Sequence, residues 1–155
     1  MRAPPILLAV LLAAAAFGTA RAELQSFAKS TLAIETAKGP QRFAIELALS
    51  PAQQEQGLMF RRAMAPDAGM LFVFSQSRIQ SFWMHNTLIP LDMLFIAADG
   101  RIVDIHERAV PLSDESIVSK APARAVLELN GGTAARLGIM PGDVVRAAAF
   151  GNAAK

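Results

Sequence analysis

The sequence predicts a mainly β (β-rich α+β) protein, folded as a compact single-domain barrel or sandwich of short strands with two short helices. Three observations predict this class. Apolar runs of strand length recur along the chain and are separated by turn residues. The pair Asp99-Gly100 is a strong two-residue hairpin signal. Only two segments carry the start and stop signals of helices.

Strands are expected where apolar residues alternate with polar ones or run together without a break. The expected strands cover residues 31–36, 42–49, 70–74, 79–84, 92–98, 101–107, 125–129 and 143–148. The segment 109–122 carries two prolines and is expected to be irregular.

Both expected helices are short. The first starts at Ser50, whose side chain can accept from the backbone of Gln53 while Gln53 reaches back, and it stops at Gly57. The second follows Asn130-Gly131-Gly132 and stops at Gly138.

The Asp99-Gly100 hairpin gives a register. A two-residue turn pairs Ile96 with Val103 and Leu94 with Ile105, and it places Asp92 directly opposite Glu107. Like charges in that position repel, so the pair predicts either a site with coupled carboxyl groups or a hydrated strand end.

The first residues have the pattern of an export signal. Arg2 precedes an apolar run over residues 6–17, which is too short to span a bilayer, and Ala20-Arg21-Ala22 is a cleavage motif. We therefore expect a cleaved signal peptide (1–22), a lead-in (23–30), a β-rich domain (31–148) and a tail (149–155), in a periplasmic or secreted protein.

Charge and cysteine content narrow the classes of partner. The chain has 15 basic and 13 acidic residues, and Arg2 and Arg21 leave with the signal, so the mature charges balance. This balance gives no support for nucleic-acid binding. The chain has no cysteine, which excludes disulfides, a thiol nucleophile and thiolate metal sites.

The segment from Phe82 to Ile96 mixes polar side chains into a very apolar stretch. Buried polar groups are costly, so such a mixture marks either a satisfied core network or a site. The residues expected to bind a ligand are Arg61, Trp83, His85, Asn86, Thr87 and Asp92. For each of them a purely structural role stays open.

Five blocks of the sequence resemble a known family. They are Gly57-Leu58-Met59-Phe60-Arg61, Gly69 to Phe74, Phe82 to Asp92, Asp99-Gly100, and Gly138-Ile139 with Gly142-Asp143-Val144. The chain is identified by them as a member of the family called domain of unknown function number 192, over roughly residues 31–146. The resemblance implies a single small β-rich domain, often behind a signal peptide, with no assigned activity.

The chain departs from that family at two points. Many relatives carry lysine where this chain has His85, so a fixed charge becomes titratable. Some relatives carry a cysteine pair in the segment matching 109–120, where this chain has Pro111, Ser113 and Asp114. A redox role for that loop is excluded here.

Four functions are weighed. The first is a non-enzymatic exported module that binds a small polar ligand or a cell-envelope component, without a cofactor or metal and with membrane contact only during export. The second is an acid–base hydrolase or lyase using Asp92 and Glu107, assisted by His85. The third is an interaction module that pairs through a strand edge.

The last is a copper site of methionines and histidines. It would draw on two histidines, His85 and His106, and on the methionines Met59, Met64, Met70, Met84, Met93 and Met140. No Met-x-x-Met or His-x-His spacing supports it, and no common enzyme motif is present.

Overall fold

The computed structural model describes residues 24–153. Its elements are β1 (Ala28–Thr36), β2 (Gly39–Ala48), α1 (Pro51–Gln56), β3 (Ala68–Arg78), β4 (Ser81–Phe82), β5 (Leu91–Ile96), β6 (Ile102–Ala109), β7 (Ile117–Val118), β8 (Ala123–Asn130), α2 (Thr133–Leu137), β9 (Val144–Arg146) and the 3-10 turn η1 (Ala148–Phe150). The expected signal peptide lies outside the described residues.

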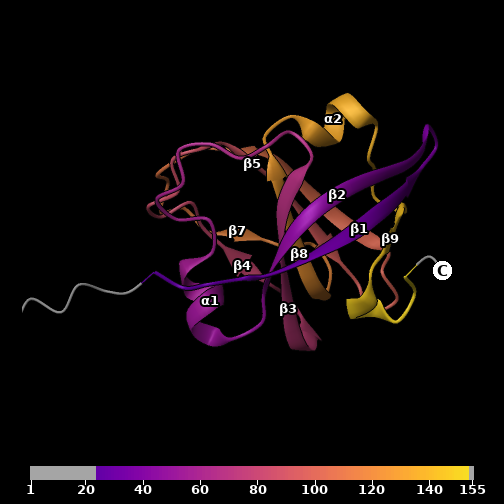
Figure 1. The fold of residues 1–155 in the computed structure, drawn as a ribbon, viewed down its shortest axis with the longest axis horizontal. Helices are drawn as coiled ribbons and strands as arrows, with labels where there is room; N and C mark the ends of the chain where they lie inside the picture. Colours follow the sequence, from indigo (N-terminus) through magenta and orange to yellow (C-terminus); the bar gives the residue numbers. More distant parts are fainter. Residues whose placement is uncertain (1–23, 154–155) are drawn as a thin grey trace, which may run out of the picture.

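Seven strands form one strongly curled sheet in the order β6-β5-β8-β3-β2-β1-β9, and β4 pairs with β7 in a separate ribbon (Figure 1). Only β2 and β3 run parallel, because α1 carries the chain from one to the other. The predicted mainly β class with two short helices is confirmed, and the sheet is a half-barrel rather than a sandwich.

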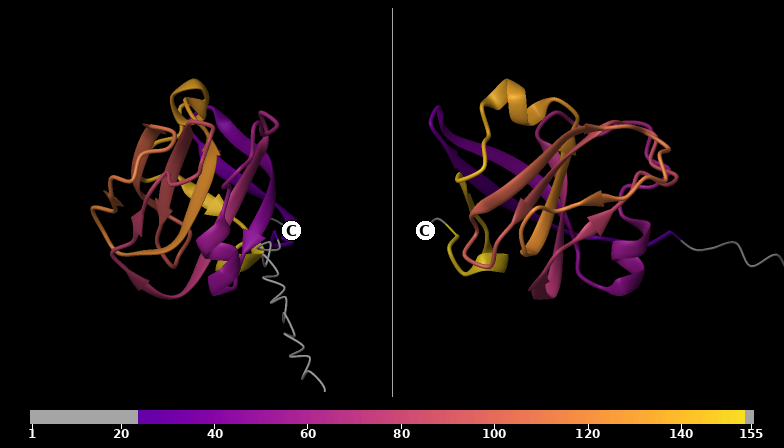
Figure 2. Two further views of the ribbon diagram at one scale, coloured as in Figure 1. Left: turned by 90° about the vertical axis from the view of Figure 1, so that its left-hand side faces the viewer. Right: turned by 180° about the vertical axis from the view of Figure 1, so that it is seen from behind.

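The two ends of the sheet approach each other. Arg101, just before β6, forms a bridge with Val144 of β9, and Ile102 donates its N–H to the carbonyl of Asp143 at 2.9 Å. Figure 2 shows β9 beside the start of β6 from behind. Both edge strands are therefore partly paired, which protects them from pairing with another chain.

Each face of the sheet has its own apolar core. The inner core includes Leu32, Ile34, Leu94 and Leu127 and is covered by α2 and η1. The outer core gathers Leu58, Met70, Phe72, Met84, Met93 and Phe95. Phe82 of β4 seats the small ribbon on this outer core, with edge-on contacts to Phe72 at 5.1 Å and to Phe95 at 6.3 Å between ring centroids.

The expected helices and strands are present, but several of them begin or end at other residues than predicted. The capping box of Ser50 and Gln53 forms as predicted. The expected strand over 79–84 shrinks to β4, because the chain there turns away into the loops. The expected strand over 143–148 is only β9, and β7 lies in the segment expected to be irregular.

The predicted hairpin register holds in the middle and fails at both ends. Leu94 pairs with Ile105, as expected, but Ile96 pairs with Ile102. The predicted two-residue turn is wrong here, because the loop has three residues, Ala98-Asp99-Gly100, and is closed by Ala97 N–H donating to the carbonyl of Arg101 at 2.8 Å. A second shift makes Leu91 pair with Ala109. This β-bulge sets two residues, Glu107 and Arg108, against the single residue Asp92.

Because of the bulge, Asp92 and Glu107 do not form the facing carboxylate pair that the sequence predicted. The Asp92 side chain is completely buried, whereas Glu107 is exposed. Asp92 accepts three backbone N–H groups, from Arg108, Gly132 and Ala134, each at 2.8 Å. Its charge is therefore met by backbone dipoles, and it acts as the missing cap of α2, whose first residues have no capping side chain of their own.

Replacing Asp92 with alanine leaves three backbone donors without an acceptor. We expect Asp92→Ala to lower the free energy of unfolding by about 3 kcal/mol or more. The matched control Glu107→Ala removes an exposed carboxylate and should change it by less than about 0.5 kcal/mol. Urea denaturation of the two variants measures both values, and equal small losses would contradict the capping role.

Candidate functional site

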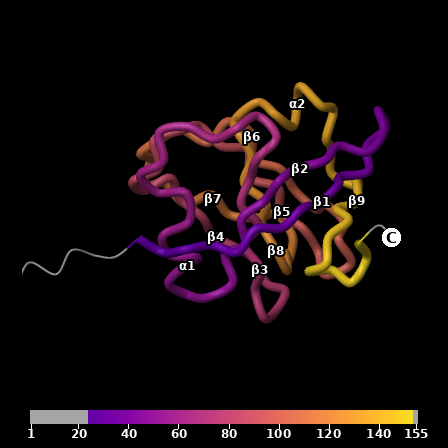
Figure 3. Tube along the Cα trace, in the orientation of Figure 1, coloured from indigo at the N-terminus to yellow at the C-terminus, as the bar shows by residue number. Residues whose placement is uncertain are grey.

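Three loops meet at one end of the molecule and form what we call the three-loop surface: residues 57–64, 83–90 and 110–116. The middle loop is hydrogen-bonded to both neighbours, because Phe60 N–H donates to Asn86 O at 2.9 Å and Leu112 N–H donates to Thr87 O at 3.1 Å. Figure 3 traces these loops together at the left-hand end, beside the start of the described chain.

Large apolar side chains are exposed on all three loops. Phe60 is 54% exposed, Trp83 51%, Leu88 42%, Val110 68% and Leu112 59%. Single exposed apolar residues are common on proteins, but a group of them on adjacent loops marks an interaction surface.

Two of these residues are held in a strained backbone conformation. Phe60 has φ 66° and Leu112 has φ 62°, in the left-handed region that bulky side chains avoid. Asn86, which lies between them, has φ 52° and tolerates it better. Strain of this kind persists where the surrounding structure enforces it, and it is concentrated at functional sites.

Trp83 and His85 form the polar part of the same surface. Their rings stack with centroids 4.8 Å apart and planes at 26°. The Nδ1 atom of His85 lies 2.7 Å from Oδ1 of Asp114, which fixes the imidazole from the neighbouring loop. The prediction that Trp83 and His85 lie on one side of their segment agrees with this stack. No motif in the sequence marks Asp114, which lies in the segment 109–122 that was expected to be irregular.

The other predicted ligand residues do not join a single cleft. Thr87 is buried and its hydroxyl donates to the carbonyl of His85, so it stabilises the bend. Arg61 pairs with Glu46 and lies over the ring of Phe27 at 5.8 Å. Asp92 caps α2, as described above. The cleft that the sequence predicted is thus divided between a surface and the core.

Three hollows flank the three-loop surface. One of about 230 Å³ is bounded by Trp83 together with Gln54, Arg78 and Gln80. The second, of about 290 Å³, is bounded by Arg61, Glu46 and Met64. The third, of about 310 Å³, is bounded by Val110, Ser113 and Glu115 of the third loop together with His106 and Lys120. None of these three hollows has Phe60, Leu88 or Leu112 in its lining.

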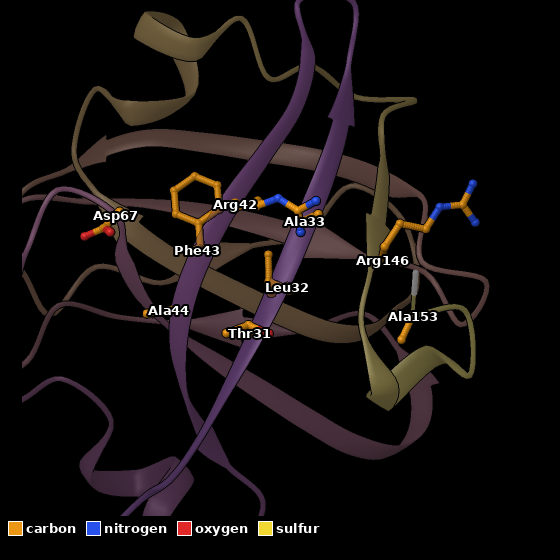
Figure 4. A pocket seen from close by; sticks show the side chains of 9 residues that line it. All are labelled: Thr31, Leu32, Ala33, Arg42, Phe43, Ala44, Asp67, Arg146 and Ala153. Atoms are coloured by element: carbon orange, nitrogen blue, oxygen red, sulfur yellow. The ribbon is translucent and has the colours of Figure 1, made fainter. Parts of the chain in front are cut away.

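A further hollow of about 300 Å³ lies over β1, β2 and β9 (Figure 4). The strand register places Ala33 between Arg42 and Arg146, and in Figure 4 the side chain of Arg42 extends across Ala33. Arg146 also lies 3.9 Å from Glu35. None of these residues was singled out by the sequence.

Glu128 is a buried carboxyl group that sequence reasoning missed. It is 4% exposed and lies on the outer-core face of β8, between Met70 of β3 and Met93 of β5. Burial away from water raises its pKa from 4.5 to about 8, so the group is largely protonated at neutral pH. The signal in the sequence was one charged residue within an apolar strand.

The methionines serve mainly as core. Met70, Met84 and Met93 are completely buried in the outer core, whereas Met140 is 63% exposed on another part of the molecule. Within residues 24–153 no three His, Cys, Asp or Glu side chains come together as they would around a metal ion. In that same range no helix is long and apolar enough to span a membrane.

The strain at Phe60 and Leu112 can be measured directly. Asparagine adopts positive φ more readily, so Phe60→Asn and Leu112→Asn should each leave the free energy of unfolding unchanged or raise it by up to about 1 kcal/mol. Val110→Asn is the control, because Val110 is exposed on the same loop without positive φ. Chemical denaturation tests this, and a large loss at Phe60 and Leu112 would contradict it.

Glu128 should make stability depend on pH. The unfolded carboxyl releases its proton near pH 4.5, but the folded one holds it to about pH 8, so unfolding becomes easier as pH rises through that window. The free energy of unfolding of Glu128→Gln, measured relative to that of the native protein, should therefore rise by several kcal/mol between pH 4.5 and about pH 8 and then level off. Urea denaturation at a series of pH values would refute this if the two profiles ran parallel.

Comparison with known proteins gives the family. The model of the DUF192 family, described as "Uncharacterized ACR", matches residues 33–147. A search of the curated proteins finds no match.

Two solved structures are similar over most of the chain. One is described as a "putative transcription regulator" from Sinorhizobium meliloti 1021, with 52% identity and a TM-score of 0.79, covering 82% of this chain and 99% of that one. The other is a protein of unknown function from Novosphingobium aromaticivorans DSM 12444, with 41% identity and a TM-score of 0.75, covering 77% of this chain and 85% of that one. Because the family model matches more than half of the chain, from the middle of β1 to just past β9, this chain belongs to the DUF192 family.

Proposed function

We propose that this chain is an exported, non-enzymatic binding domain and that the three-loop surface is its binding surface. Its ligand is a small polar molecule or a component of the cell envelope. The observation that carries the proposal is the pair Phe60 and Leu112. Both hold exposed apolar side chains in a disfavoured backbone conformation, on opposite sides of the same bend. Selection for stability alone would favour residues that tolerate positive φ at these two positions.

The Trp83–His85 stack supports the same assignment. An exposed indole offers a large contact area, and an imidazole held by Asp114 offers a polar contact of fixed direction. Aromatic residues of this kind are enriched where proteins bind partners. The N-terminal signal pattern, Arg2 followed by an apolar run and Ala20-Arg21-Ala22, is what supports export.

The alternatives have weaker support. The hydrolase or lyase needed Asp92 and Glu107 as a facing pair, but one is buried under three N–H groups and the other is exposed. Pairing through a strand edge needs a free edge, and the bridge of Arg101 to Val144 partly occupies both. A role in transcription, which the description of the Sinorhizobium protein names for that protein, has no support in the charge of this chain, because the basic and acidic residues of the mature chain balance.

The test compares binding to envelope fractions. The mature native chain, the double variant Phe60→Asn/Leu112→Asn and the control Met140→Asn would each be incubated with membranes, with peptidoglycan and with soluble envelope extract. We expect one fraction to retain the native chain and the control. The double variant should bind that fraction with an affinity at least about tenfold lower. Met140 is a matched control because it is similarly exposed, at 63%, but lies outside the three loops.

Emission from Trp83, the only tryptophan, gives a second readout. Binding at the three-loop surface should shift its emission and shield it from a soluble quencher. Retention of the double variant at native strength, or binding that leaves Trp83 emission unchanged, would sink the proposal.

A further inference from the structure

The described chain begins beside the three-loop surface. Gln25 N–H donates to Oε1 of Gln56 at 2.7 Å, and Nε2 of Gln53 donates to the carbonyl of Ser26 at 2.8 Å. The ring of Phe27 lies under the guanidinium of Arg61. These contacts fasten the start of the described chain to α1 and to the first of the three loops (Figure 1).

Earlier in the sequence lies the apolar run over residues 6–17, which the proposed function takes as an export signal. The stretch between that segment and Gln25 is seven residues, which reach about 25 Å at most when fully extended. While the segment is in the membrane, the three-loop end is therefore the end of the domain that is tethered closest to the lipid.

We propose that the three-loop surface docks on a phospholipid membrane, with Phe60, Leu88 and Leu112 buried among the acyl chains just below the headgroups. Trp83 and His85 then lie at headgroup depth, where rings with one apolar and one polar side are favoured. This inference rests on the proposed function and names its partner. It also extends membrane contact beyond the export step that the sequence predicted.

The form of the surface favours lipid over a compact ligand. The apolar side chains belong to separate loops, and Phe60, Leu88 and Leu112 line none of the three hollows nearby. Projecting apolar tips fit a fluid layer that closes around them, whereas a small molecule needs a concave site.

The charges around the tips are mixed. The three loops carry two arginines, Arg61 and the exposed Arg62, and two exposed acidic residues, Asp114 and Glu115. Cations and anions of similar number leave little net attraction to anionic lipid. Apolar burial must then supply most of the affinity, so binding should be weak, reversible and nearly independent of lipid charge and salt.

The test uses the mature chain, residues 23–155, with vesicles of phosphatidylcholine alone and of phosphatidylcholine mixed with phosphatidylglycerol. We expect the emission of Trp83 to shift to shorter wavelength and the protein to sediment with both kinds of vesicle. The double variant Phe60→Asn/Leu112→Asn should bind both kinds of vesicle with an affinity at least about tenfold lower than that of the native chain. Met140→Asn should bind as the native chain does. Circular dichroism confirms that each variant is folded.

Several results would overturn the inference. One is no Trp83 shift with either vesicle, and another is equal binding by the double variant. Binding only to the anionic vesicles, abolished by salt, would assign the contact to charge instead. A dimer in sedimentation velocity that the double variant abolishes would make a second copy of the chain the occupant.

Failure of the inference is distinguishable from failure of the proposed function. If the native chain ignores vesicles but the same two residues are needed for peptidoglycan or soluble extract, only the membrane partner is wrong. If Phe60 and Leu112 matter for none of these probes, both proposals fall.

Discussion

The arrangement of the whole molecule depends on one buried carboxylate. Asp92 receives N–H groups from β6 and from the start of α2, so a single side chain on β5 ties its own hairpin to a helix that begins about 40 residues later in the sequence. The glycines at α2 are part of the same arrangement. Gly131 donates to the carbonyl of Pro90 at 2.8 Å, and a Cβ there would lie about 3 Å from Pro90. The carboxylate can reach the helix only because the backbone approaches so closely.

The two faces of the sheet are therefore used differently. The inner face is closed by α2, which Asp92 holds, and by the contact of β9 with the start of β6. The outer face is closed by loops and the small β4–β7 ribbon, which Phe82 seats on the sheet. Loops can present side chains that strands bury, so the face with the looser cover also carries the exposed aromatic residues.

Local signals in the sequence predicted local structure well. The capping box at Ser50 and the middle of the hairpin depend on neighbouring residues, and both are in the structure. The predicted two-residue turn at Asp99-Gly100 is wrong, because Ala97 and Arg101 close a loop of three residues, Ala98-Asp99-Gly100. The role of Asp92 could not be predicted, because a bulge at Glu107 and Arg108 displaces the register and the donors of α2 lie about 40 residues away. Trp83 and His85 were found because polar and aromatic residues stood out in an apolar segment. Phe60 and Leu112 were missed because nothing in a sequence indicates positive φ at a bulky residue.

The position of β1 has a consequence for the order in which the chain can fold. β1 lies between β2, its neighbour in the sequence, and β9, which follows more than a hundred residues later. Ala33 pairs with Arg146, so the curled sheet is complete only when nearly the whole chain is present. Contacts between such distant residues form slowly. If the chain is exported from its N-terminus, as proposed above, the sheet stays open until its last strand has crossed the membrane, and transport finishes before the fold closes.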